Sequence, residues 1–184
     1  EAAGYPETYD HNNPDSWGVG PFPMNNPNGV RMSTALTYIN PNRHRLNLTI
    51  KGNVTVNRIL FDGRKAVGVE AESEGEVFFL GADLIVLSAG AIGSPHLLML
   101  SGIGPSDHLN ANGIEVVKDI PGVGQNLRDH PCVTIRVQTK DDFPLDPQAP
   151  RMQTLLRYTA NGSKDRNDMQ IFPSMLTGPL GGDP

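Results

Sequence analysis

Apolar and polar side chains alternate over several short stretches in the first half of the chain, a pattern typical of half-buried β-strands. The alternation predicts one strand over residues 46–50 and a second over residues 54–61. Asp62-Gly63 follows directly and is a strong signal for a hairpin turn. Residues 67–71 alternate as the returning strand, and residues 77–80 follow as a further strand. The strands from residue 54 onward therefore predict an antiparallel meander.

The next apolar run, Leu84 to Leu87, contains no polar residue. An unbroken apolar run predicts a strand that is covered on both faces, as in parallel sheets. The chain then passes through Ser88-Ala89-Gly90 toward a predicted helix. Ser94 suits the N-cap of that helix and Pro95 its first position, and Gly102 would end it. A parallel strand followed by a helix, joined to a meander, predicts an α/β fold.

The remaining elements have weaker signals. The first 34 residues are rich in Pro, Gly and Asn and read as loop, except for a short helix from Ser33 to about Ile39 with Ser33 as its N-cap. The other expected elements are a helix over 106–111, a strand over 114–117, a strand near 133–137, a helix near 152–158 and a strand near 169–172.

Composition narrows the class of protein. The 184 residues are 38% hydrophobic and 19% charged, which excludes a disordered chain. Twenty glycines and sixteen prolines indicate many turns and argue against a bundle of long helices. The formal net charge is -5 and no long basic run occurs, so we expect no nucleic-acid partner.

Few side chains suggest a catalytic or metal site. The single cysteine, Cys132, excludes an internal disulfide and a cysteine-rich metal site, and its apolar neighbours favour a packing role. The five histidines show no metal-ligand spacing, and the pair Asp129-His130 favours a structural hydrogen bond over acid–base chemistry. The serines lack the G-x-S-x-G elbow of serine hydrolases.

The sequence also bears on location. No apolar stretch approaches the roughly 20 residues that span a bilayer. The chain opens with Glu-Ala-Ala-Gly and not with a basic and then apolar leader. We therefore expect no transmembrane segment and a cytoplasmic location.

The turn after the predicted parallel strand is the strongest candidate for a binding site. Glycines at the end of such a strand, followed by a helix N-terminus, place free backbone N–H groups where dinucleotides bind in open α/β sheets. Ser88, Ala89 and Gly90 would then contact a nucleotide, although ordinary tight packing of the turn explains them equally well. The dinucleotide fingerprint G-x-G-x-x-G is absent from the sequence, so any such site is incomplete.

Residues 81–105, GADLIVLSAGAIGSPHLLMLSGIGP, resemble the second signature of the glucose-methanol-choline (GMC) family of flavin oxidoreductases. Residues 121–131 and 28–61 resemble the family's neighbouring blocks, and the resemblance covers about residues 14–135 well. The whole chain is similar to the middle of a longer, choline-dehydrogenase-like enzyme. The signature residues present are Gly93, Ser94, Pro95, Leu97, Leu98, Ser101, Gly102, Ile103 and Gly104.

The resemblance implies FAD as cofactor and part of a Rossmann-like FAD-binding domain, made of a parallel sheet and a β-meander, at residues 28–125. Residues 1–27 and 126–184 would then be parts of an α+β substrate domain. Val56 matches a valine whose backbone meets the adenine of FAD, and Ser88-Ala89-Gly90 match a turn beside the adenosine. The family's catalytic histidine has no counterpart here, so the resemblance implies no catalytic residue in this chain.

The implied function is oxidation of a small-molecule alcohol to an aldehyde or ketone by hydride transfer to FAD. Two other classes stay open: a GMC-fold lyase whose flavin does no redox chemistry, and a non-catalytic fragment. Expected partners besides the substrate are the rest of a longer parent chain or a second copy of the protein.

Overall fold

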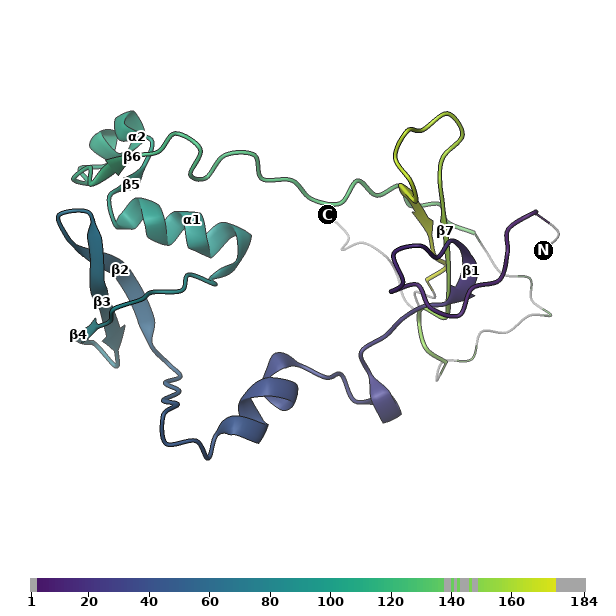
Figure 1. Ribbon diagram of the computed structural model, residues 1–184, viewed down its shortest axis with the longest axis horizontal. Coiled ribbons are helices and arrows are strands. Elements are labelled where there is room, and N and C mark those ends of the chain that lie inside the picture. The colour runs from purple at the N-terminus through teal and green to yellow at the C-terminus, as the bar shows by residue number, and fades with distance from the viewer. Residues whose placement is uncertain (1–2, 138–139, 141, 143–145, 147–148, 175–184) are drawn as a thin grey trace. The chain divides into compact units, whose positions relative to one another are not determined.

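The computed structural model describes residues 3–137, 140, 142, 146 and 149–174. The chain forms two compact units (Figure 1), one made of Arg45–Val133 and the other of Glu1–His44 with Thr134–Pro184. The boundaries of these units differ from those of the domains expected from the sequence, which are 28–125 and 1–27 with 126–184. The assignment of these parts to FAD-binding and substrate domains stays a prediction.

An antiparallel meander forms the sheet of the unit Arg45–Val133, as the alternation predicts. Its strands are β2 (Thr55–Asp62), β3 (Lys65–Ser73) and β4 (Glu76–Gly81), in the order β2-β3-β4. Gly63 has a φ of 57° in the first turn, which is the left-handed conformation that the Asp-Gly signal anticipates. This sheet is therefore specified mainly by local sequence.

Two helices and a short parallel pair complete this unit. Helix α1 (Gly90–Leu100) packs along β2, and α2 (Ser106–Ala111) lies between β5 (Ile103–Gly104) and β6 (Lys118–Asp119) in the sequence. Strands β5 and β6 pair in parallel. Ile59, Ala71 and Leu109 are its buried apolar residues. Parallel and antiparallel pairing together with helices confirm the α/β class.

The other unit is built on a second antiparallel sheet of order β1-β7-β8, with β1 (Gly18–Pro21), β7 (Thr154–Tyr158) and β8 (Met169–Ile171). The guanidinium of Arg157 donates hydrogen bonds to the backbone carbonyls of His11, Asn13 and Ser16. It thereby fixes the loop before β1 onto β7. In the β7–β8 connection, the Ala160 N–H donates to the Asp168 carboxylate at 2.8 Å and lowers the pKa of that carboxyl.

Short helical turns link β1 to the next unit: η1 (Pro27–Gly29), η2 (Ala35–Ile39) and η3 (Asn40–Asn42). The predicted helix near 33–39 is confirmed, and the Ser33 hydroxyl accepts a hydrogen bond from the Leu36 N–H at 3.3 Å. The turns continue through Asn40-Pro41, because Pro41 lies in the first turn of η3, where the missing N–H of proline costs no hydrogen bond.

Several secondary-structure predictions from the sequence are wrong. Residues 46–50 and 133–137 form no strand, and residues 154–158 form β7 in place of a helix. The strand expected over 114–117 begins only at Lys118. Cys132, expected to pack as an apolar residue, is exposed.

Residues 84–87 also differ from the expectation of a covered parallel strand. They pair with no strand among the residues that the structure describes. Leu84 and Val86 are 80% and 77% exposed, whereas Ile85 and Leu87 are half-buried. One face of the segment therefore packs on its own unit and the other stays uncovered.

Helix α1 starts five residues earlier than predicted, with Ala89 as its N-cap in place of Ser94 and with Pro95 inside the helix. The Ser94 hydroxyl still accepts a backbone hydrogen bond, from the Ala89 N–H at 3.0 Å. None of the helices in the described ranges has the length and apolar character needed to cross a membrane.

Candidate cofactor site

A cavity of about 830 Å³ lies within the unit Arg45–Val133, between β2, the extended segment 85–89 and α1. Val69 of β3 also contributes to its wall. Cavities of roughly 300–1,000 Å³ are the usual size for small-molecule sites. Its lining residues are Thr55, Val56, Asn57, Ile59, Val69, Ile85, Val86, Leu87, Ser88, Ala89, Gly93, His96, Leu97 and Leu100.

A β-bulge shapes the wall formed by β2. The pairing of β2 with β3 shifts between Val56 and Arg58, so Asn57 has no partner residue on β3. In a regular strand consecutive side chains point to opposite faces, but a bulge re-aims them. This explains how Thr55, Val56 and Asn57 in succession all line the cavity.

The segment after β4 forms the second wall. Ile85 and Leu87 turn their side chains toward their own unit, and Ser88 and Ala89 extend the same wall up to α1. Gly90 follows with a φ of 83°, a conformation that favours glycine. Apart from its neighbours along the chain and in the helix backbone, no heavy atom lies within 4 Å of where a Cβ of Gly90 would stand. The backbone of this turn is therefore open to a ligand.

Helix α1 supplies the third wall. Gly93, His96, Leu97 and Leu100 follow the spacing i, i+3, i+4, i+7 and so share one face. The first N–H groups of any α-helix lack intrahelical partners and carry partial positive charge. Those of α1 begin at Gly90, directly after the lining residue Ala89.

The chemistry of the lining is that of a binding site. Most lining side chains are aliphatic, and the polar ones are Thr55, Asn57, Ser88 and His96. No acidic or basic residue other than that histidine lines the cavity. Among the described residues no group of three His, Cys, Asp or Glu side chains could hold a metal.

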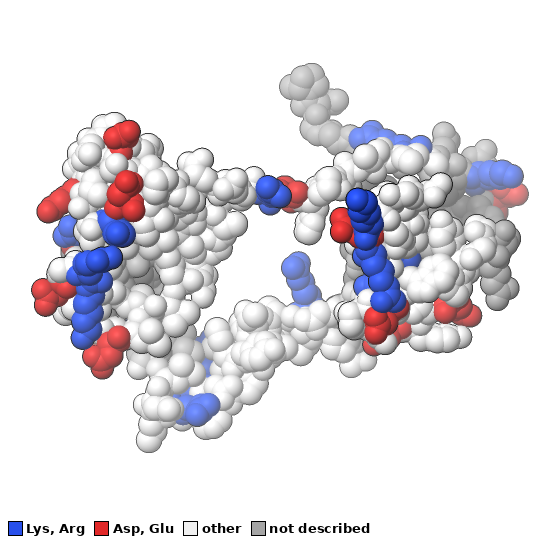
Figure 2. Space-filling view, turned by 45° about the horizontal axis from the view of Figure 1, so that its top comes forward, with Lys and Arg blue, Asp and Glu red and all other residues white. Residues whose placement is uncertain are grey.

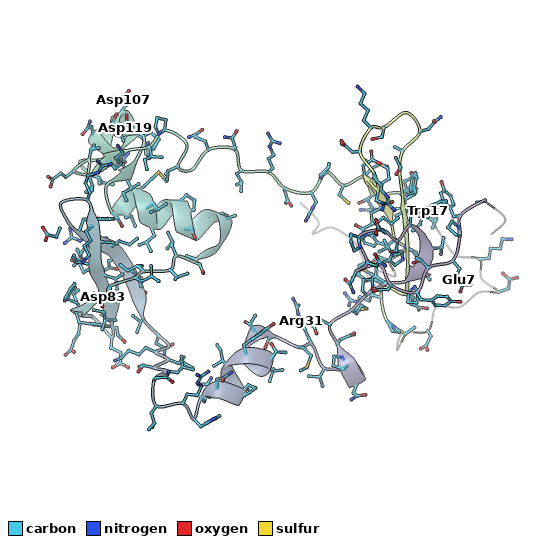
Figure 3. All side chains as sticks on the ribbon, in the orientation of Figure 1. Glu7, Trp17, Arg31, Asp83, Asp107 and Asp119 are labelled. Atoms are coloured by element: carbon cyan, nitrogen blue, oxygen red, sulfur yellow. The ribbon has the colours of Figure 1, made fainter. Side chains whose placement is uncertain are left out.

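Charged side chains of this unit lie elsewhere. Acidic and basic side chains are interspersed on the face that Figure 2 shows, without a continuous basic stripe over the described residues. The aspartates labelled in this unit in Figure 3, Asp83, Asp107 and Asp119, do not line the cavity. The Asp119 carboxylate instead accepts the Ser106 N–H at 3.0 Å, at the start of α2.

The structure brings three of the four predicted cofactor residues to one cavity. Val56, Ser88 and Ala89 line it, and Gly90 is the next residue but is not among the lining. Their contact with FAD stays a prediction. Asn57 and His96 also line the cavity and were not predicted as site residues from the sequence. A helix start placed at Gly90 would have put His96 on the cavity face by its spacing from Gly93.

Comparisons with known proteins agree with the resemblance seen in the sequence. A family model described as GMC oxidoreductase matches residues 1–132. An uncharacterized GMC-type oxidoreductase of Rhodococcus erythropolis is 41% identical over 154 residues, 84% of this chain. An oxygen-dependent choline dehydrogenase of Photobacterium profundum is 44% identical over 131 residues, 71% of this chain.

Solved structures of flavoenzymes share the fold. The crystal structure of pyridoxine 4-oxidase from Mesorbium loti matches this chain with a TM-score of 0.72 and 30% sequence identity. The match covers 94% of this chain and 33% of the oxidase chain. A formate oxidase has a TM-score of 0.70 and 26% identity over 84% of this chain and 31% of that one.

The chain spans only a part of these proteins: 31% of the Rhodococcus protein and 23% of the Photobacterium enzyme. The match of the family model nevertheless covers most of this chain, including β2, the turn 88–90 and α1. The chain belongs to the GMC oxidoreductase family.

Proposed function

We propose that this chain is part of an FAD-dependent enzyme that oxidises an alcohol to an aldehyde or ketone. The family supports flavin chemistry, and relatives named choline dehydrogenase and pyridoxine 4-oxidase support an alcohol as substrate. A structural neighbour is named an FAD-dependent oxidoreductase, of Chaetomium thermophilum, with a TM-score of 0.64 and 34% identity. The proposed substrate is a small-molecule alcohol.

The observation that carries the proposal is the cavity between β2, residues 85–89 and α1. Its size and its largely aliphatic lining suit a planar base such as adenine, and its few hydroxyl and amide groups suit a ribose. The N-terminal turn of α1 next to Ala89 suits a phosphate. The residues present therefore fit the adenosine half of FAD.

In this proposal, Val56 and Ser88 to Gly90 hold the adenosine half. Val56 presents its backbone at the bulge of β2, and the open turn at Gly90 allows close approach. When bound, FAD supplies the hydride-accepting chemistry of the enzyme. The role of these residues is to bind and orient, and to keep water from the apolar side of the cavity.

We assign no catalytic residue to this chain. The lining residues include no histidine–carboxylate pair, and proton removal from an alcohol needs a base within hydrogen-bond reach of the substrate. The base would come from a part of the protein outside this chain. Residues 28–125 would be the FAD-binding part, and residues 1–27 and 126–184 parts of the substrate domain.

The test is anaerobic reduction of the purified full-length protein by candidate alcohols. Loss of the oxidised-flavin absorption, with formation of one aldehyde or ketone per flavin, is the expected result. A flavoprotein that cleaves its substrate without bleaching would instead be a GMC-fold lyase. A protein that purifies without flavin and takes up none would contradict the proposal.

A further inference from the structure

Helix α1 places one histidine at the centre of its cavity face. His96 follows Gly93 by three residues and precedes Leu100 by four, and all three line the cavity. The other lining residues of α1 have no polar side chain. His96 is therefore the polar side chain of this helix that is placed to contact a molecule bound in the cavity.

The imidazole of His96 is available to a ligand. It is exposed, and within the described part of the chain it makes no hydrogen bond or ion pair. Neighbouring polar groups of the helix are already engaged, since the Ser94 hydroxyl accepts the Ala89 N–H and the Ser101 hydroxyl donates to the Leu97 carbonyl. His96 has both ring nitrogens free, one a donor and one an acceptor in the neutral form.

The surroundings make such a hydrogen bond selective. The other polar side chains of the lining are Thr55 and Asn57 on the β2 wall and Ser88 on the connecting segment. The remaining lining residues are glycine or have aliphatic side chains, so His96 is the only polar side chain that α1 contributes to the lining. Leaving such an oxygen unpaired in an apolar site weakens binding.

We propose that His96 is a cofactor-binding residue, whose imidazole hydrogen-bonds an oxygen of the adenosine-monophosphate half of FAD. The proposal rests on the proposed function, because it takes FAD as the occupant of the cavity. It adds a side-chain contact from α1 to the contacts expected from Val56 and the turn 88–90. The ring positions the cofactor and takes no part in the redox step.

The experiment compares FAD affinity of the flavin-free full-length protein and its variants by quenching of flavin fluorescence. His96→Leu removes the hydrogen bond at similar volume, and His96→Gln keeps a donor and an acceptor. His108→Leu is the matched control, because His108 lies on α2 of the same unit but does not line the cavity. Unfolding of each flavin-free variant is followed by circular dichroism.

We expect His96→Leu to raise the dissociation constant of FAD roughly five- to tenfold, the loss typical of one hydrogen bond. His96→Gln should stay within about twofold of wild type, as should His108→Leu, with unfolding midpoints unchanged. Weakening of AMP competition by His96→Leu, with adenosine competition unaffected, would place the contact at the phosphate. Equal weakening of both would place it at the nucleoside.

Wild-type affinity in His96→Leu, or equal weakening in the Leu and Gln variants, would overturn the assignment of His96 and leave the proposed function standing. Absence of FAD uptake by the wild-type protein would contradict the proposed function and the assignment together. The two failures are thus distinguishable in one series of titrations.

Discussion

The hydroxyl of Ser101 accepts a hydrogen bond from the backbone N–H of Ile59 at 2.8 Å and donates one to the Leu97 carbonyl at 2.5 Å. Both Ser101 and Ile59 are 6% exposed. The bond joins the end of α1 to the middle of β2, two of the elements that line the cavity. The signature serine of the family thus has a structural role in this fold.

Replacing Ser101 by Ala should lower the free energy of unfolding by roughly 1–3 kcal/mol, because the N–H of Ile59 then stays buried without an acceptor. Denaturant unfolding followed by circular dichroism measures the loss. Ser73→Ala is the control: the Ser73 hydroxyl donates to the Asn53 carbonyl at an exposed position. Equal losses in the two variants would show that the Ser101 bond does not hold α1 to β2.

Gly90→Val should lower the flavin-to-protein ratio of the folded full-length protein. The branched side chain would occupy the open space beside the turn, where the backbone is expected to approach FAD. The ratio is measured on the monodisperse fraction from gel filtration, which removes unfolded protein from the comparison.

Backbone strain alone is controlled by Gly113→Val. Gly113 has a φ of 70°, close to the 83° of Gly90, and its Cβ would also meet no atom within 4 Å. It follows α2 and does not line the cavity. A normal flavin ratio in folded Gly90→Val, or an equal drop in Gly113→Val, would remove Gly90 from the cofactor site.

Gly20→Ala should destabilise the unit that contains β1 by roughly 1–3 kcal/mol or more, because overpacking a tight contact is costly. A Cβ there would overlap the Thr8 carbonyl oxygen and stand 3.1 Å from Nε2 of the buried His11. Thermal unfolding of the variant measures the effect. Gly52→Ala, where a Cβ meets nothing within 4 Å, should leave the transition unchanged.

Arg157→Lys should also destabilise this unit, by roughly 1–3 kcal/mol, because an ammonium cannot replace the planar fork that holds three carbonyls. Arg166→Lys is the matched control, since its ion pair with Asp15 is exposed and such pairs contribute less than about 1 kcal/mol. Urea unfolding of the two variants should differ clearly. Equal midpoints would mean that the loop before β1 does not depend on Arg157.

The meander could be predicted because its signals are local. Asp62-Gly63 favours the turn conformation that the structure shows, and the alternation on either side sets which residues face the core. β1 could not be predicted in this way, since its partner β7 lies more than a hundred residues away in the sequence. Five residues such as Thr154–Tyr158 do not distinguish a strand from a helix by periodicity alone.

The candidate site was predicted in part. The resemblance pointed to Val56 and to the turn 88–90, and the structure brings Val56, Ser88 and Ala89 to one cavity. Asn57 reaches the cavity through a bulge, which depends on the register with β3 and leaves no mark in the alternation. The position of His96 on the cavity face was not predicted, because Ser94-Pro95 is typical of a helix start, whereas α1 begins at Gly90.

The most direct test of the central claim is a crystal structure of the full-length protein with FAD bound. We predict that the adenosine half lies between β2 and α1, in contact with Val56 and with the turn from Ser88 to Gly90. An oxygen of this half should lie within hydrogen-bond distance of His96. Adenosine bound elsewhere, with other parts of the protein filling this cavity, would contradict it.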